Sequence, residues 1–127
     1  MELEITIDVD DVDRAVEFYC TGLGLTLVDR APNWARAELN GQTFWLCRFE
    51  AGTHGNTTRD FQRHWTPVHL DFVVDNVDKA VQRVLAAGGR LDREIKRNEP
   101  EPIRCRSDVA NFSDPAGNGV DLVQRHW

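Results

Sequence analysis

One eight-residue segment occurs twice in this chain, and it restricts the fold more than any other feature. The segment 9–16 (VDDVDRAV) recurs 65 residues later as 74–81 (VDNVDKAV). Six of the eight positions are identical, and the other two exchange Asp for Asn and Arg for Lys. A repeat at a fixed period indicates a structure assembled from copies of one supersecondary unit. We therefore predict two copies of one unit within the 127 residues.

Each copy begins with a pattern typical of a strand followed by a helix. Apolar and polar side chains alternate over 5–9 and again over 70–74, which predicts strands with one apolar face. From Val12 and from Val77 the apolar spacing changes to i, i+3, i+4, i+7, i+8, which predicts two amphipathic helices. Asp or Asn precedes each helix as a candidate N-cap, and glycines follow each helix.

Three further strands are predicted after each helix. They lie around 25–30, 34–39 and 42–49 in the first copy, and around 90–95, 104–112 and 119–124 in the second. The pair Asn40-Gly41 is a strong hairpin signal between the last two strands of the first copy. We predict an α+β fold in which two βαβββ modules form a curved mixed β-sheet. The modules span 1–50 and 67–127, with a linker at 51–66, within one domain of residues 1–127.

Composition narrows the class of protein. The formal net charge is −6 with no basic stripe, which argues against nonspecific nucleic-acid binding. Three widely spaced cysteines include no Cys-x-x-Cys pair, so neither a zinc ribbon nor a disulfide scaffold is indicated. The first residues lack the features of a signal peptide, and no apolar run reaches the length of a membrane span. We expect a cytoplasmic protein whose partner is a small molecule rather than nucleic acid or membrane.

The motifs at both ends of the chain resemble one known superfamily. The Val-x-Asp-Val segment, the helix containing Phe18-Tyr19, and the run 22–25 (GLGL) look like the opening module of the vicinal-oxygen-chelate superfamily, which includes glyoxalases, bleomycin-resistance proteins and dioxygenases. The turn 114–118 (DPAGN), followed by a Val-x-Leu-Val strand, is similar to its closing hairpin. The resemblance covers essentially the whole chain, but one fold can host unrelated chemistries.

The resemblance also implies a candidate metal site. Metal-using members carry ligands on the first and last strand of each module, and the matching positions here are Glu4, Cys47, His69 and Asp121. We predict Glu4, His69 and Asp121 as metal ligands, with Glu4 or Asp121 as the catalytic carboxylate that moves a proton. Imidazole plus carboxylates suits zinc, nickel, manganese or iron. Cys47 is more simply a residue lining the cleft, and a one-residue slip of its strand would replace it with a neighbour.

Three further side chains are candidates for substrate binding. The segment 60–68 holds Arg63 and Trp65 just before the His69 strand, and it is either a surface loop or a lid that holds an anionic planar substrate. Arg104 is either a solvated edge charge on a strand or a ligand for a carboxylate or phosphate. The terminal Trp127 needs a contact, which we expect either with the partner subunit of a homodimer or over the cleft.

We therefore predict, first, a metal-dependent enzyme of the glyoxalase I-like lyase or isomerase type, in which two substrate oxygens bind the cation. The alternative is a metal-free, bleomycin-resistance-like protein that binds a small molecule or antibiotic. An extradiol-type dioxygenase comes third, because its usual ligand pattern of two His and one carboxylate is not found at the matched positions.

Overall fold

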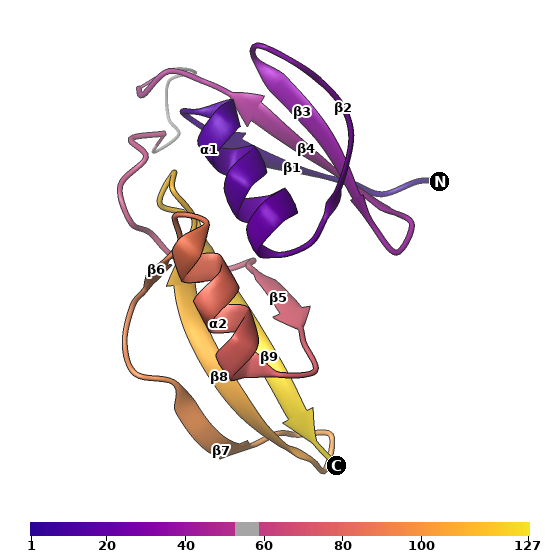
Figure 1. The fold of residues 1–127 in the computed structure, drawn as a ribbon, viewed down its shortest axis with the longest axis vertical. Helices are drawn as coiled ribbons and strands as arrows, with labels where there is room; N and C mark the ends of the chain where they lie inside the picture. The colour runs from indigo at the N-terminus through magenta and orange to yellow at the C-terminus, as the bar shows by residue number, and fades with distance from the viewer. Residues whose placement is uncertain (53–58) are drawn as a thin grey trace.

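The computed structural model describes residues 1–52 and 59–127 and consists of two similar modules, each with a sheet and helical elements on one side of it (Figure 1). The first module contains β1 (Glu4–Val9), α1 (Val12–Val16), the π-helix η1 (Glu17–Gly22), β2 (Thr26–Ala31), β3 (Trp34–Leu39) and β4 (Gln42–Arg48). The second contains β5 (Leu70–Val73), α2 (Val77–Ala86), β6 (Arg90–Leu91), β7 (Lys96–Pro100), β8 (Arg106–Ser113) and β9 (Gly119–His126).

Both sheets have the same topology, which confirms the α+β fold of two βαβββ units. The first sheet has the order β1-β4-β3-β2, and the second has the order β5-β9-β8-β6 with β7 also on β8. In each sheet the first strand of the module lies parallel to the last, and the remaining pairs are antiparallel. Among the described residues the paired strands always belong to the same module, so each module contributes its own mixed sheet.

Both helices start as the sequence predicts, but the first one changes its winding. The Asp11 carboxylate accepts a hydrogen bond from the Arg14 N–H, and the Asn76 side chain accepts one from the Lys79 N–H. After Val16 the chain widens into η1. The wider winding accompanies the burial of two consecutive aromatic residues, Phe18 and Tyr19, a pattern that the spacing of an α-helix does not predict.

The second module departs from prediction at two strand ends. The strand expected over 90–95 is interrupted, because β6 ends at Leu91 and pairing resumes only at Lys96. The strand expected from 104 begins at Arg106 instead. Arg104 therefore lies in the preceding turn with a positive φ of 61°, and its predicted place on a strand is wrong.

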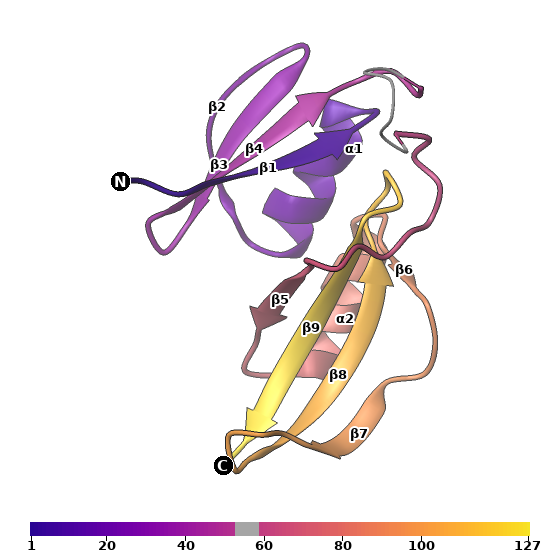
Figure 2. The ribbon, with the colours of Figure 1, turned by 180° about the vertical axis from the view of Figure 1, so that it is seen from behind.

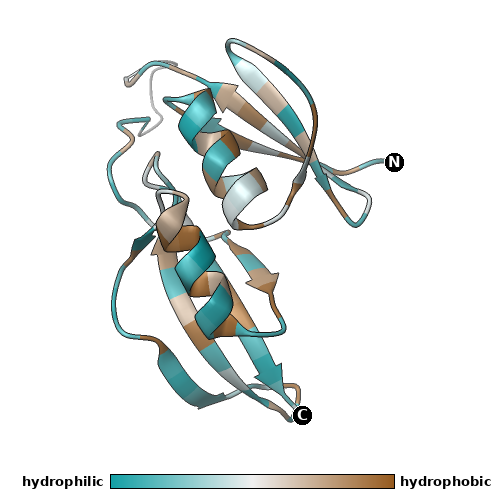
Figure 3. Ribbon diagram, viewed as in Figure 1, coloured by the Kyte–Doolittle hydropathy of each residue, from teal (hydrophilic) through white to brown (hydrophobic). Residues whose placement is uncertain are grey.

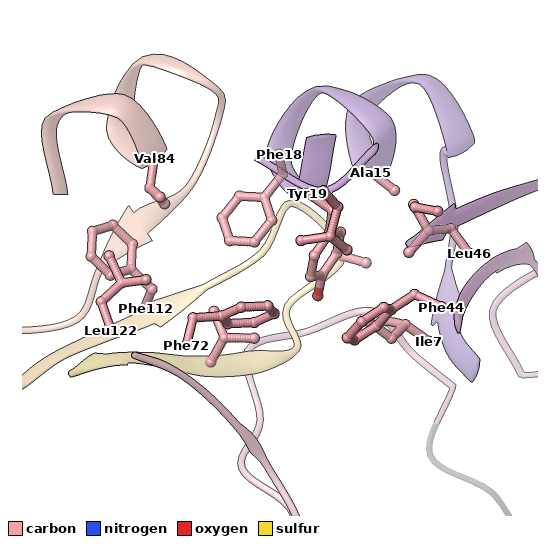
Figure 4. Packing of buried hydrophobic residues seen from close by; sticks show 14 of the residues in the cluster. Ile7, Ala15, Phe18, Tyr19, Phe44, Leu46, Phe72, Val84, Phe112 and Leu122 are labelled. Carbon is pink, nitrogen blue, oxygen red and sulfur yellow. The ribbon is translucent and has the colours of Figure 1, made fainter. Parts of the chain in front are cut away.

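A single apolar core joins the two modules. Apolar and polar residues alternate along the strands and helices, as Figure 3 shows by colour. Phe44 of β4 and Phe72 of β5 lie with ring centroids 6.4 Å apart, so side chains from both sheets meet in the core (Figure 4). Phe18 projects from η1 into the same cluster, in the direction of Val84 of α2 (Figure 4). The opposite face of both sheets carries no helix, as the view from behind shows (Figure 2).

A buried hydrogen-bond network also joins the modules. The Tyr19 hydroxyl donates to Asp114 Oδ2 at 2.6 Å. The other carboxylate oxygen accepts from the N–H groups of Ala116 and Asn118, both at 2.9 Å. The Asn118 side-chain amide donates to Asp114 Oδ2 and to the carbonyl of Asp8 in β1. The closing turn of the second module is thereby attached to the helix and to the first strand of the first module.

No described helix is long and apolar enough to cross a bilayer.

We predict that Tyr19→Phe lowers the free energy of unfolding by about 1–3 kcal/mol, because it removes one donor from a buried carboxylate. Urea denaturation measures the change. In an Asp114→Ala background the same substitution should cost much less, since its partner is already gone. Equal costs of Tyr19→Phe in both backgrounds would show that the two side chains do not stabilise the fold as a pair.

Candidate functional site

A row of polar side chains crosses the helix-free face of the second sheet. In the register of the sheet, Asp71 of β5 lies opposite Asp121 of β9, and Asp121 lies opposite Asn111 of β8. His69 precedes β5 by one residue and shares the face of Asp71, because side chains two residues apart in a strand point the same way. The other face of these strands holds the apolar residues that pack beneath α2.

His69, Asp71 and Asp121 form a compact cluster of possible metal ligands. His69 Nε2 lies 3.2 Å from Asp71 Oδ1 and 3.5 Å from Asp121 Oδ2. One ligand atom from each residue lies within 4.8 Å of the other two. Bonds of 2.0–2.2 Å to a tetrahedral zinc ion place neighbouring ligand atoms about 3.4 Å apart. An imidazole and two carboxylates at these separations therefore fit a divalent cation.

Asn111 orients one of these carboxylates. Its side-chain amide donates to Asp121 Oδ1 at 2.7 Å, which leaves Oδ2 toward His69. The Asp121 side chain is 12% exposed, whereas the side chains of His69 and Asp71 are 38% and 46% exposed. The cluster thus has one fixed, buried carboxylate and two groups that solvent reaches. Such outer hydrogen bonds hold metal ligands in place in known sites.

The charges in the cluster are not fully compensated. Burial raises the pKa of Asp71, and the nearby Asp121 carboxylate raises it further, while His69 and Arg125 act in the opposite direction. Two carboxylates this close disfavour each other's ionisation unless a proton or a cation lies between them. The His69 imidazolium or a divalent metal can fill that role, and both would use the same atom, Nε2.

A cleft of about 540 Å³ opens beside the cluster, between the two modules. Its walls come from β1, from the segment that leads into β5, and from the closing turn before β9; the lining residues that carry polar groups are Thr6, Asp8, Tyr19, Arg59, His64, Thr66, His69 and Asn118. His69 belongs to both the cleft and the cluster. A small molecule in this cleft would therefore reach the cluster through His69.

Two of the predicted metal ligands are brought together and one is not. His69 and Asp121 lie in the cluster, but Glu4 lies outside it and accepts a hydrogen bond from the Trp45 indole N–H at 2.8 Å. Within one chain Glu4 lies outside the cluster because it is at the start of β1, which belongs to the other sheet.

Cys47 lies two residues along β4 from the position that matches Asp121. Thr6, the repeat partner of Asp71, pairs with Trp45, so Trp45 rather than Cys47 is the counterpart of Asp121. Cys47 pairs instead with Asp8. Burial raises the pKa of the Cys47 thiol, and the charge of Asp8 adds to the increase. A raised thiol pKa leaves less of the thiolate form, which is the form that binds metals.

Arg63 and Trp65 lie at the edge of the cluster. The Trp65 ring stands edge-on to His69 with centroids 5.4 Å apart, and the Arg63 guanidinium lies over Trp65, 4.4 Å from its centroid. Arg63 is also ion-paired with Asp92. These contacts anchor the segment before β5, and with Arg63 so engaged Trp65 is the better candidate for a substrate contact. Arg104 is exposed in the turn before β8.

Two residues of the candidate site were not among those predicted: Asp71, which belongs to the cluster, and Asn111, which donates a hydrogen bond to it. The alternation of β5 places Asp71 on the face of His69, and this signal was sufficient to identify it. Asn111 depends on the pairing of β8 with β9, which the sequence of one chain does not reveal.

We predict that Asp121→Asn lowers the pKa of Asp71 toward its ordinary value, because it removes the neighbouring charge that raises it. Carboxyl ¹³C NMR on chelator-treated protein measures this pKa. Asp10→Asn is the matched control and should leave the pKa of Asp71 unchanged. An unchanged pKa in Asp121→Asn would mean that the two carboxylates do not interact.

Several solved structures share this fold. A glyoxalase/bleomycin resistance protein/dioxygenase family enzyme from Burkholderia phytofirmans PsJN is 19% identical, with a TM-score of 0.73 over 95% of each chain. The fosfomycin resistance protein FosX from Listeria monocytogenes is 16% identical, with a TM-score of 0.72 over 100% of this chain and 92% of its own. Lactoylglutathione lyase from Agrobacterium tumefaciens is 23% identical, with a TM-score of 0.64 over 98% of this chain and 92% of its own. These likenesses show the fold alone.

The family follows from the sequence match. No curated protein sequence is significantly similar to the chain. The model of one family, however, the glyoxalase-like domain, matches residues 4–123, which is nearly the whole chain. The match confirms the resemblance drawn from the opening module and the closing turn. The chain belongs to the glyoxalase-like domain family, within the vicinal-oxygen-chelate superfamily.

Proposed function

We propose that this protein is a metal-dependent enzyme acting on a small oxygenated molecule, of the glyoxalase I-like lyase or isomerase type. The observation that carries the proposal is the cluster of His69, Asp71 and Asp121 at the edge of an open cleft. One imidazole and two carboxylates suit zinc, nickel, manganese or iron, and they leave coordination positions for substrate oxygens.

The residues would divide the work as follows. When bound, the cation supplies an electrophile that stabilises negative charge on a substrate oxygen. Asp121 is fixed by Asn111 and holds its place as a ligand. Asp71 has a raised pKa and is partly exposed, which suits a carboxylate that accepts and returns a proton. From the sequence we predicted that Glu4 or Asp121 moves the proton. We now propose that Asp71 shares this role with Asp121.

Glu4 remains a candidate ligand through association. The superfamily resemblance implies that the site of some relatives lies across a dimer interface. We propose a homodimer in which Glu4 of the partner subunit approaches the cluster. The hydrogen bond from Trp45 holds Glu4 at the surface of its own sheet, where the carboxylate is exposed and accessible to a second chain.

We predict that chelator-treated protein binds Zn²⁺, Ni²⁺ or Mn²⁺ with a stoichiometry of one per chain, measured by calorimetric titration. His69→Ala should abolish this binding, because it removes the one nitrogen ligand. His126→Ala is the control, since His126 pairs with Asp108 and lies outside the cluster. Binding that survives in His69→Ala would place the metal elsewhere.

We also predict a dimeric mass by light scattering. Trp127 is 86% exposed in the single chain, and burial of so large an apolar surface favours association. A monomeric mass over a broad concentration range would contradict the homodimer, and with it the shared site.

The second candidate function is a metal-free protein that binds a small molecule in the cleft. One observation favours it: His69 Nε2 is within 3.5 Å of a carboxylate oxygen of each acid, so an imidazolium can offset one of the two carboxylate charges without a metal. The same titration separates the candidates, since the binding protein would take up none of the three metals. One His and two carboxylates do not match the usual dioxygenase set of two His and one carboxylate.

A further inference from the structure

Two buried side-chain atoms lack a hydrogen-bond partner among the described residues, and both lie on the face that carries the cluster. They are Asn111 Oδ1, an acceptor, and Arg125 Nε, a donor. Asn111 lies opposite Asp121, and Arg125 follows Asp121 by four residues in β9, so all three side chains leave the same face. Buried polar groups are nearly always satisfied, so a donor and an acceptor left open on one face indicate a ligand with the complementary groups.

Arg125 supplies a cation for that ligand. Within residues 1–52 and 59–127 its side chain makes no hydrogen bond and no ion pair. It lies four residues beyond Asp121 in β9, on the face that carries the cluster. A guanidinium offers paired N–H donors whose geometry matches a carboxylate.

Asn111 supplies an acceptor whose position is fixed. Its amide nitrogen donates to the Asp121 carboxylate, and a flipped side chain would place the amide oxygen against that carboxylate instead. The negative charge of Asp121 therefore sets the orientation of the Asn111 amide, and Asn111 Oδ1 remains an acceptor without a donor among the described residues. The ligand group that it needs is a donor, and a hydroxyl is the common one among small metabolites.

We propose that this face binds a small hydroxylated carboxylic acid, with its carboxylate on Arg125 and a hydroxyl on Asn111 beside the His69–Asp71–Asp121 cluster. The inference deepens the proposed function by naming its substrate class, and it rests on that function only for the claim that the ligand reacts. Arg125 and Asn111 are specificity-determining residues for this acid. About 13 Å of strand separates the Cα atoms of Asp121 and Arg125 at 3.3 Å per residue, so a chain of several carbons fits better than a two-carbon acid.

The probe is gluconate, a six-carbon hydroxylated carboxylate, added to ¹⁵N-labelled, chelator-treated full-length protein. We expect saturable NMR shifts of the Arg125 Nε–H and the Asn111 side-chain amide. Sorbitol lacks the carboxylate and hexanoate lacks the hydroxyls, and both should bind about tenfold more weakly or worse. Sodium chloride at equal ionic strength controls for nonspecific screening.

Variants then test the named residues. Arg125→Met should weaken gluconate binding by about tenfold or more, and Arg125→Lys should restore part of it. Arg93→Met is the control, because Arg93 is exposed outside this face, and it should bind as the parent does. The proposal is overturned if gluconate moves neither signal, if chloride reproduces its effect, or if Arg125→Met binds equally well.

Repeating the titration with Zn²⁺ separates this inference from the proposed function. Gluconate binding through Arg125 in protein that takes up no metal would support the acid site and reject the metal-dependent enzyme. Metal uptake through His69 with no effect of Arg125→Met would keep the enzyme and reject the acid site.

Discussion

The hydrogen bond from Tyr19 to Asp114 is the interaction on which the arrangement of the two modules depends. Asp114 is 2% exposed, and a carboxyl buried this deeply is tolerated only when donors surround it. The donors come from both modules, since Tyr19 belongs to η1 while Ala116 and Asn118 belong to the closing turn. Burial and the Asp114 charge raise the pKa of Tyr19, which keeps the phenol protonated and able to donate.

The same turn shapes the candidate site. Asn118 lines the cleft and also donates to the carbonyl of Asp8 in β1, so the turn sets the distance between the cleft's two walls. The segment before β5 lies on this turn through the His64 N–H, which donates to the Gly117 carbonyl at 3.0 Å. A side chain at Gly117 would meet the Gln62 carbonyl oxygen at 2.3 Å, and one at Gly119 would meet the Trp65 ring. These glycines let the segment approach closely enough to bring His69 beside Asp121.

Local patterns in the sequence predicted most of the fold. The repeat and the change of apolar period identified both βαβ openings, because strand and helix periodicity are set by neighbours along the chain. The break after Leu91 and the π-helix at Glu17–Gly22 were not predictable in this way, since both depend on contacts with distant elements. The site divides similarly. His69 and Asp121 were predicted from the family resemblance. Asn111 and Arg125 became candidates only through the pairing of β8 with β9 and through side-chain atoms that lack a hydrogen-bond partner among the described residues.

The confinement of strand pairing to each module has a consequence for how chains can assemble. A second copy could replace one module of this protein with its own, and every described ladder of sheet hydrogen bonds would survive the exchange. Among the described residues, the shared core and the Tyr19–Asp114 network would have to form again, between two chains instead of within one. Domain swapping is therefore inexpensive for this architecture.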